Sequence, residues 1–173
     1  AGARAARLGA DHLARRRTRQ DDRPFGPQPP DRRNRLSEAA HVLVLGATGF
    51  IGGHTAAALN AQGLRVTGTS RTGEGADLAC DLLDPSSVEA ALSGEVPDAV
   101  VMAAGLSSVR AAWDDPPAAF ANNTRGVFNL LEALGRSAPG AHLTMLSSAS
   151  VYGPPQSLPL TEESATEPSS PYG

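Results

Sequence analysis

The chain has 173 residues, 40% of them hydrophobic, which is enough for one folded domain with a tail. Its net charge of −3 is unevenly spread: residues 1–36 hold ten arginines against four aspartates, and residues 37–173 hold five arginines against fourteen acids. The single cysteine, Cys80, excludes an internal disulfide and a multi-cysteine zinc site, so we predict no metal and a buried thiol. No apolar run approaches the ~18 residues of a membrane span, and no signal peptide is evident, so we expect a cytoplasmic protein away from membranes.

Residues 1–36 are rich in arginine, proline and aspartate and show no sustained periodicity. We predict a disordered tail here, with a possible short helix over residues 3–16. The run Arg15-Arg16-Arg17 leaves nucleic-acid binding or a transit peptide as alternatives to a solvated tail. We expect no nucleic-acid partner.

From residue 41 the pattern changes to short apolar runs that alternate with helical segments. Asp84-Pro85 and Asp115-Pro116 each indicate a helix start, with aspartate as the N-cap and proline in the first turn. Strands alternating with helices predict an α/β fold with a doubly wound parallel sheet of the Rossmann type. The expected strands are 41–45, 64–69, 76–80, 98–104 and 141–147, and the expected helices are 50–60, 84–92 and 115–136.

A glycine-rich loop joins the first expected strand to the first helix, with the spacing G-x-x-G-x-x-G. Gly46 permits a tight turn, Gly49 lets the backbone approach a pyrophosphate, and Gly52 lets the helix pack close to the strand. The helix N-terminus presents free N–H groups and a positive dipole to phosphates. We therefore predict a dinucleotide-binding loop that also includes Thr48, Phe50 and Ile51.

The loop and five later blocks resemble the extended short-chain dehydrogenases/reductases, the sugar-nucleotide epimerase/dehydratase family, over residues 41–173. The resemblance implies an incomplete NAD(P)-binding domain for this chain. It also implies that Asp81 and Leu82 meet the adenine ring, that the segment of Ala103, Ala104 and Gly105 lies under the cofactor, and that Asn123 steadies the central strands.

The end of the second strand bears on the choice of nicotinamide cofactor. NAD enzymes place an acidic residue there for the ribose 2′-hydroxyl, whereas this chain has Thr69-Ser70-Arg71. Arginine suits a 2′-phosphate through its charge and its fork of donors. We therefore predict binding through Ser70 and Arg71 and favour NADP over NAD, the alternative being that Arg71 is a solvated loop residue.

By resemblance, Ser148 and Tyr172 are the catalytic pair that brackets the reacting carbon, and Tyr152 belongs to a structural Val-Tyr-Gly element. A free tyrosine has a pKa of about 10, and the family lowers it with a lysine four residues further on. That lysine would fall at position 176, beyond Gly173. We therefore expect the chain to be an N-terminal fragment without the C-terminal substrate lobe and without appreciable turnover.

The resemblance implies hydride transfer at a carbinol or carbonyl carbon of a nucleotide-sugar. The family's dehydratases carry an acid after the catalytic serine, and Ala149 and Ser150 stand there, so we expect an epimerase or 4-ketoreductase. Ser107 and Ser108 are candidate substrate contacts, although such residues also form turns. A reductase of a non-sugar carbonyl and a non-catalytic NAD(P)-binding protein are the alternatives.

For the intact protein we expect a homodimer through the helix at about 115–136 and the one starting at Tyr172.

Overall fold

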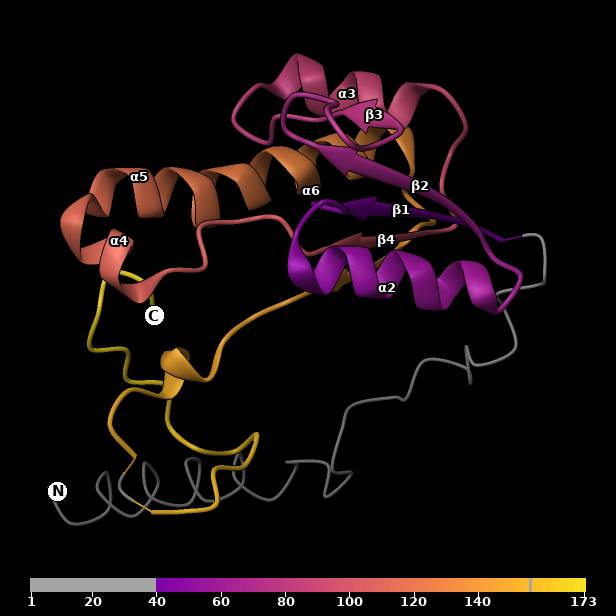
Figure 1. Ribbon diagram of the computed structural model, residues 1–173. Helices are drawn as coiled ribbons and strands as arrows, with labels where there is room; N and C mark the ends of the chain where they lie inside the picture. The colour runs from indigo at the N-terminus through magenta and orange to yellow at the C-terminus, as the bar shows by residue number, and fades with distance from the viewer. Residues whose placement is uncertain (1–39, 156) are drawn as a thin grey trace, which may run out of the picture. The chain divides into compact units, whose positions relative to one another are not determined.

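The computed structural model describes residues 40–155 and 157–173; the tail predicted for residues 1–36 lies outside them. Five parallel strands form one sheet in the order β3-β2-β1-β4-β5 (Figure 1). This arrangement confirms the Rossmann-type fold class. The strands are β1 (His41–Leu45), β2 (Arg65–Ser70), β3 (Leu78–Ala79), β4 (Ala99–Met102) and β5 (His142–Met145).

Helices cover both faces of the sheet, so the central strand β1 is buried on both sides. Leu43 and Leu45 of β1 pack in a core with α3 (Pro85–Ser93) and α6 (Gly126–Ser137). Val42 and Val44 face the other way, in a smaller core with side chains of α2 (Phe50–Ala61). The uninterrupted apolar run of β1 is therefore the signature of a strand between two helical layers.

The helix expected over 115–136 is built differently. It consists of α5 (Pro116–Phe120), a π-helix η2 (Ala121–Arg125) and α6, and a short helix, α4 (Val109–Asp114), precedes it. Asp115 caps α5 as predicted, but sequence periodicity did not indicate α4 or the π turn. A π turn widens the helix by one residue, a distortion common at functional sites.

Three strands are shorter than expected, because the central strands end early. At Gly46 (φ +84°) the chain turns out of the sheet, so β1 ends at Leu45, and β4 ends opposite it at Met102. The predicted strands over 98–104 and 141–147 therefore lose their last residues, and a 3-10 helix, η3 (Ala149–Tyr152), follows β5 after a short loop. The strand predicted over 76–80 shrinks to β3, which pairs only with the end of β2.

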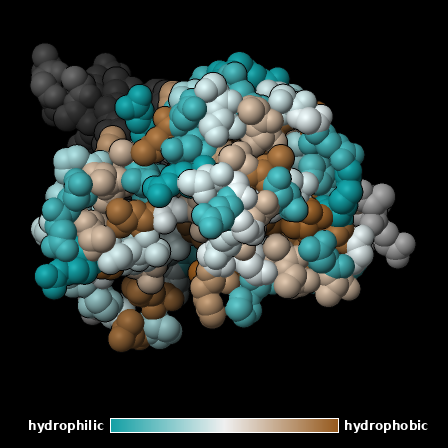
Figure 2. All heavy atoms as spheres, turned by 45° about the horizontal axis from the view of Figure 1, so that its top comes forward, coloured by the Kyte–Doolittle hydropathy of each residue, from teal (hydrophilic) through white to brown (hydrophobic). Residues whose placement is uncertain are grey.

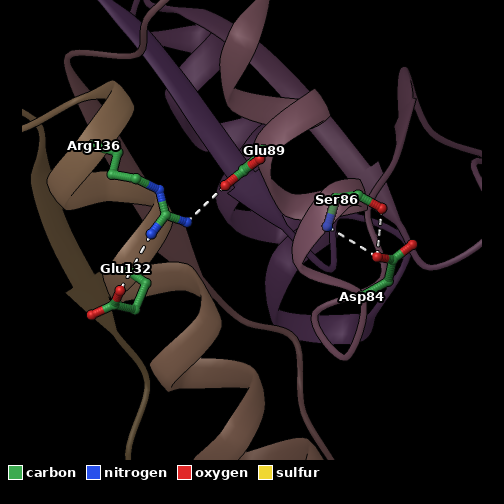
Figure 3. Close-up of polar contacts among 5 residues, drawn as sticks. All are labelled: Asp84, Ser86, Glu89, Glu132 and Arg136. Atoms are coloured by element: carbon green, nitrogen blue, oxygen red, sulfur yellow. Dashed lines mark hydrogen bonds and ion pairs between the residues drawn. The ribbon is translucent and has the colours of Figure 1, made fainter.

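Two polar arrangements fix α3 in place (Figure 3). Asp84 caps its N-terminus, accepting hydrogen bonds from the Ser86 amide at 2.9 Å and from the Ser86 hydroxyl at 2.6 Å. These bonds lower the pKa of the Asp84 carboxyl. Arg136 of α6 reaches Glu89 of α3 at 2.7 Å and Glu132 of its own helix at 3.3 Å, which links the two helices on this face.

Candidate functional site

The glycine loop has the close packing that its spacing predicts. A Cβ atom on Gly46 would lie 2.9 Å from the backbone N and Cα of Ala104, and one on Gly52 would collide with the Gly46 carbonyl oxygen. The amides of Gly46 and Ala47 donate to the Thr69 carbonyl at 3.1 and 2.8 Å. The loop is thus held between β2 and β4, and larger side chains at Gly46 or Gly52 would displace it.

The N-terminus of α2 differs from those of α3, α4 and α5. Asp84, Ser108 and Asp115 each accept a hydrogen bond from their helix's first turn, whereas Gly49 at the start of α2 has no side chain to do so. The first amides of a helix lack intrahelical partners and carry the positive end of the helix dipole. The N-terminus of α2 therefore has no capping side chain, and its first amides can donate to an anion, as a pyrophosphate site requires.

A first pocket of about 400 Å³ lies beside this loop, at the carboxyl ends of β1 and β2. It brings together eight of the predicted cofactor residues: Gly46, Thr48, Ser70, Arg71, Asp81, Leu82, Ala104 and Gly105.

The wall formed by Asp81 and Leu82 is held by local hydrogen bonds. The Asp81 amide donates to the Ser87 hydroxyl at 2.9 Å, and the Asp81 carboxylate accepts from the Leu83 amide at 2.9 Å. Cys80 stands beside them, and burial, followed by the charge of Asp81, raises the pKa of its thiol to about 11. Cys80 is thus a protonated, buried wall residue, in line with the sequence prediction.

A second pocket of about 320 Å³ continues from the first, because Ala104 and Gly105 line both. Among the predicted residues it gathers Ile51, Ala103, Ala104, Gly105, Ser107, Asn123, Ser148 and Tyr172. The candidate catalytic pair thus lines the same pocket, although Ser148 and Tyr172 are far apart in the sequence.

Asn123 fixes the loop between the pockets. Its side-chain amide makes two bonds to Leu106, accepting from the backbone N–H at 2.8 Å and donating to the carbonyl at 2.9 Å. Gly105 (φ +157°) passes so close that a Cβ atom there would lie 2.9 Å from the Asn123 Oδ1 atom. Asn123 therefore holds the chain immediately after the central strand β4.

Four predicted residues line neither pocket: Gly49, Phe50, Gly52 and Ser108. The glycines and Phe50 shape the loop and the start of α2, where Phe50 packs on His54 with ring centroids 4.7 Å apart. The Ser108 hydroxyl caps α4 by accepting from the Ala111 amide at 3.1 Å. Ser148 is also a cap, because its hydroxyl accepts from the Ser150 amide at 3.2 Å at the start of η3.

Sequence reasoning missed several lining residues. In the first pocket these include Thr72, Glu74 and Asn122, and in the second Leu106, Met145 and Val151. Asn122 directly precedes the predicted Asn123 in the π turn. Asn122 lines the first pocket and Asn123 lines the second. Glu74 adds a carboxylate to the same pocket as Arg71, a feature that the end of the second strand alone did not reveal.

The described residues contain no group of three or more histidine, cysteine or acidic side chains suited to a metal ion. Within this part of the chain, no helix is both long and apolar enough to cross a bilayer. The lining of the second pocket, as far as the structure describes it, includes no basic side chain.

The sequence matches the NAD dependent epimerase/dehydratase family over residues 42–173. UDP-glucose 4-epimerase 4 of Oryza sativa subsp. japonica is 35% identical over 76% of this chain and 41% of its own length. The UDP-glucose 4-epimerase of Brucella ovis, solved in complex with NAD, aligns with a TM-score of 0.72 at 32% identity, over 78% of this chain and 43% of that one.

RMD from Pseudomonas aeruginosa, solved with NADPH, aligns with a TM-score of 0.66 at 33% identity, over the same shares of the two chains. The chain thus spans about two fifths of the length of these relatives. The family match covers the residues that form nearly the whole sheet and both pockets. The chain therefore belongs to the NAD-dependent epimerase/dehydratase family.

Proposed function

We propose that the whole protein is an NAD(P)-dependent oxidoreductase that acts on a nucleotide-sugar as a 4-epimerase or 4-ketoreductase. The observation that carries this proposal is the continuity of the two pockets at Ala104 and Gly105. A dinucleotide laid along them would place its adenosine half near Arg71 and Asp81 and its nicotinamide half near Ser148 and Tyr172. The similarity to UDP-glucose 4-epimerases supports a UDP-sugar as substrate.

The roles of the catalytic pair follow from general acid–base chemistry. The bound cofactor would supply a hydride acceptor and donor. The Ser148 hydroxyl would hold the oxygen on the reacting carbon, and the Tyr172 oxygen would take the hydroxyl proton as the carbonyl forms. Ala149 and Ser150 begin η3 where a dehydratase would need an acid, which favours epimerisation or reduction over elimination.

Arg71 supports NADP as the preferred cofactor, because it is the one basic side chain among the described residues that line the first pocket. Glu74 and Asp81 line the same pocket and would oppose a 2′-phosphate, so the guanidinium is needed to offset them. Relatives of similar identity are solved with either NAD or NADPH.

We predict that Arg71→Ala weakens NADP⁺ binding about tenfold or more while changing NAD⁺ binding little, because a charge-assisted bond to phosphate is lost. Titration calorimetry with both cofactors measures the ratio. The matched control is Arg110→Ala, which removes an exposed arginine that pairs with Asp114 on α4. An unchanged ratio in Arg71→Ala would refute the assignment of the 2′-phosphate to Arg71.

We also propose that the whole protein is a homodimer. α5 and α6 leave Phe120, Phe128 and Leu131 exposed by 65%, 61% and 51%, whereas Leu130 and Leu134 of α6 face the core. Exposed apolar side chains at this spacing form a stripe along the outer side of the helix, which a second copy could cover.

A further inference from the structure

We propose that Asn129 of α6 is a positioning residue for the adenine end of the cofactor, acting through the backbone of Leu82. The inference rests on the proposed dinucleotide site. Asn129 lines neither pocket, so it would act on the ligand only through Leu82.

Asn129 makes a hydrogen bond to a loop far from it in the sequence. The Asn129 Nδ2 atom donates to the Leu82 carbonyl oxygen at 2.8 Å, in a partly buried setting and across 47 residues. Leu82 is 9% exposed and lines the first pocket next to Asp81. The carbonyl that faces α6 thus belongs to a residue whose other side forms the pocket wall.

α6 also approaches the Leu82 side chain closely. A Cβ atom on Gly126, three residues before Asn129, would lie 3.1 Å from the Leu82 Cβ atom. Gly126 therefore lets the helix touch the Leu82 side chain while Asn129 holds its carbonyl. Together they fix both the depth and the orientation of this wall.

The other hydrogen bonds of this loop go to different elements. The amides of Cys80 and Asp81 donate to Ser70 and Ser87, which lie on β2 and α3. Within the described residues, Asn129 makes the hydrogen bond that ties the loop to α6. Asn123 of η2, the π turn that leads into α6, holds Leu106 in a similar way. Each pocket thus has one loop fixed by an asparagine amide.

This arrangement predicts that the two asparagines affect different parts of the ligand. ADP can fill the first pocket alone, whereas NADP⁺ extends through both. Asn129→Ala should lower the affinity for ADP and for NADP⁺ by the same factor, about five- to tenfold, the effect of one lost hydrogen bond on a shared wall. Asn123→Asp should lower the affinity for NADP⁺ and leave that for ADP within about twofold of wild type.

The experiment is titration calorimetry of the 173-residue chain and its variants with ADP and NADP⁺, with circular dichroism and thermal unfolding on each variant. Asn129→Leu serves as a second variant if Asn129→Ala does not fold. The matched control is Asn60→Asp, on an exposed position near the end of α2, which should bind both ligands as wild type does. If the Asn123 and Asn129 variants both unfold at a lower temperature and both bind ADP more weakly, the effect is a general loss of structure. That result would overturn the proposal.

The outcomes separate this inference from the proposed function. If wild type binds ADP and NADP⁺ but folded Asn129→Ala binds ADP equally well, the positioning role is wrong and the site stands. If wild type binds neither ligand, the proposed dinucleotide site itself is wrong, and the role of Asn129 falls with it.

Discussion

At the scale of single residues, His41 lies at the amino end of β1, far along the sheet from the pockets. It is 5% exposed, and its Nε2 atom lies 2.9 Å from the Thr67 hydroxyl. Among the described residues its Nδ1 atom has no hydrogen-bond partner. Burial, followed by the charge of Arg65, lowers the pKa of His41, although Asp98, which accepts from its backbone amide at 2.8 Å, acts in the opposite direction.

The lowered pKa predicts a pH-dependent stability. The fold favours the neutral imidazole, so the stabilisation is fully present above the unfolded pKa of about 6.5 and is lost as the pH falls below it through the folded value. We expect the free energy of unfolding to decrease as the pH is lowered through this window, and to decrease less steeply in His41→Gln. Urea unfolding at a series of pH values measures both slopes.

The control for this prediction is His142→Gln, which removes an exposed histidine at the start of the neighbouring β5. It should keep the wild-type slope. A slope that is the same in wild type and His41→Gln would show that His41 does not contribute to acid sensitivity.

At the scale of elements, α5, η2 and α6 run on from one another along one side of the sheet (Figure 1). Their inner side carries Asn123, Gly126 and Asn129 to the loops of the two pockets. Their outer side carries the exposed apolar residues Phe120, Phe128 and Leu131. On the face that Figure 2 displays, hydrophobic residues, in brown, are scattered among polar ones. The helix thus joins the cofactor site to the surface proposed for dimerisation.

We predict that Phe128→Glu converts a dimer of the whole protein to monomers, because a charge buried in an apolar interface lacks a partner. Sedimentation velocity gives the mass of both forms. Leu158→Glu is the matched control, since Leu158 is 75% exposed and lies outside these helices. A wild-type protein that is monomeric, or a Phe128→Glu variant that is still dimeric, would contradict the proposed interface.

The sequence predicted the helices better where a cap marks their start. Asp84 and Asp115 indicated α3 and α5 correctly, because an aspartate followed by proline is a strong local signal. The π turn left no such signal, because no side chain caps η2. Strand ends were also misplaced: whether Ala103 or Ala104 continues β4 depends on where the neighbouring β1 stops.

At the scale of the whole molecule, residues from seven separate stretches of the sequence line the two pockets at the carboxyl edge of the sheet. This could be predicted, because parallel strands bring their carboxyl ends, and hence their loops, to one side. Glu74, Asn122 and Asn129 could not be predicted, because their positions depend on loop conformation and helix packing. The division of the site into two joined pockets could not be predicted either, because the spacing of residues in the sequence does not determine it.

The second pocket bears on turnover by the 173-residue chain. Ser148 and Tyr172 line it, but none of the described residues that line it supplies the cation that an acid–base tyrosine needs near neutral pH. Cofactor binding and the lack of appreciable turnover by this chain both stay predictions, and the first pocket and the glycine loop are the structural basis for the binding alone.

The most direct test of this account is a calorimetric titration of the 173-residue chain with NADP⁺ and NAD⁺. The joined pockets and the uncapped N-terminus of α2 predict saturable binding of one dinucleotide per chain, with NADP⁺ bound more tightly. A folded chain that binds neither dinucleotide would contradict the central claim that these pockets form a dinucleotide site.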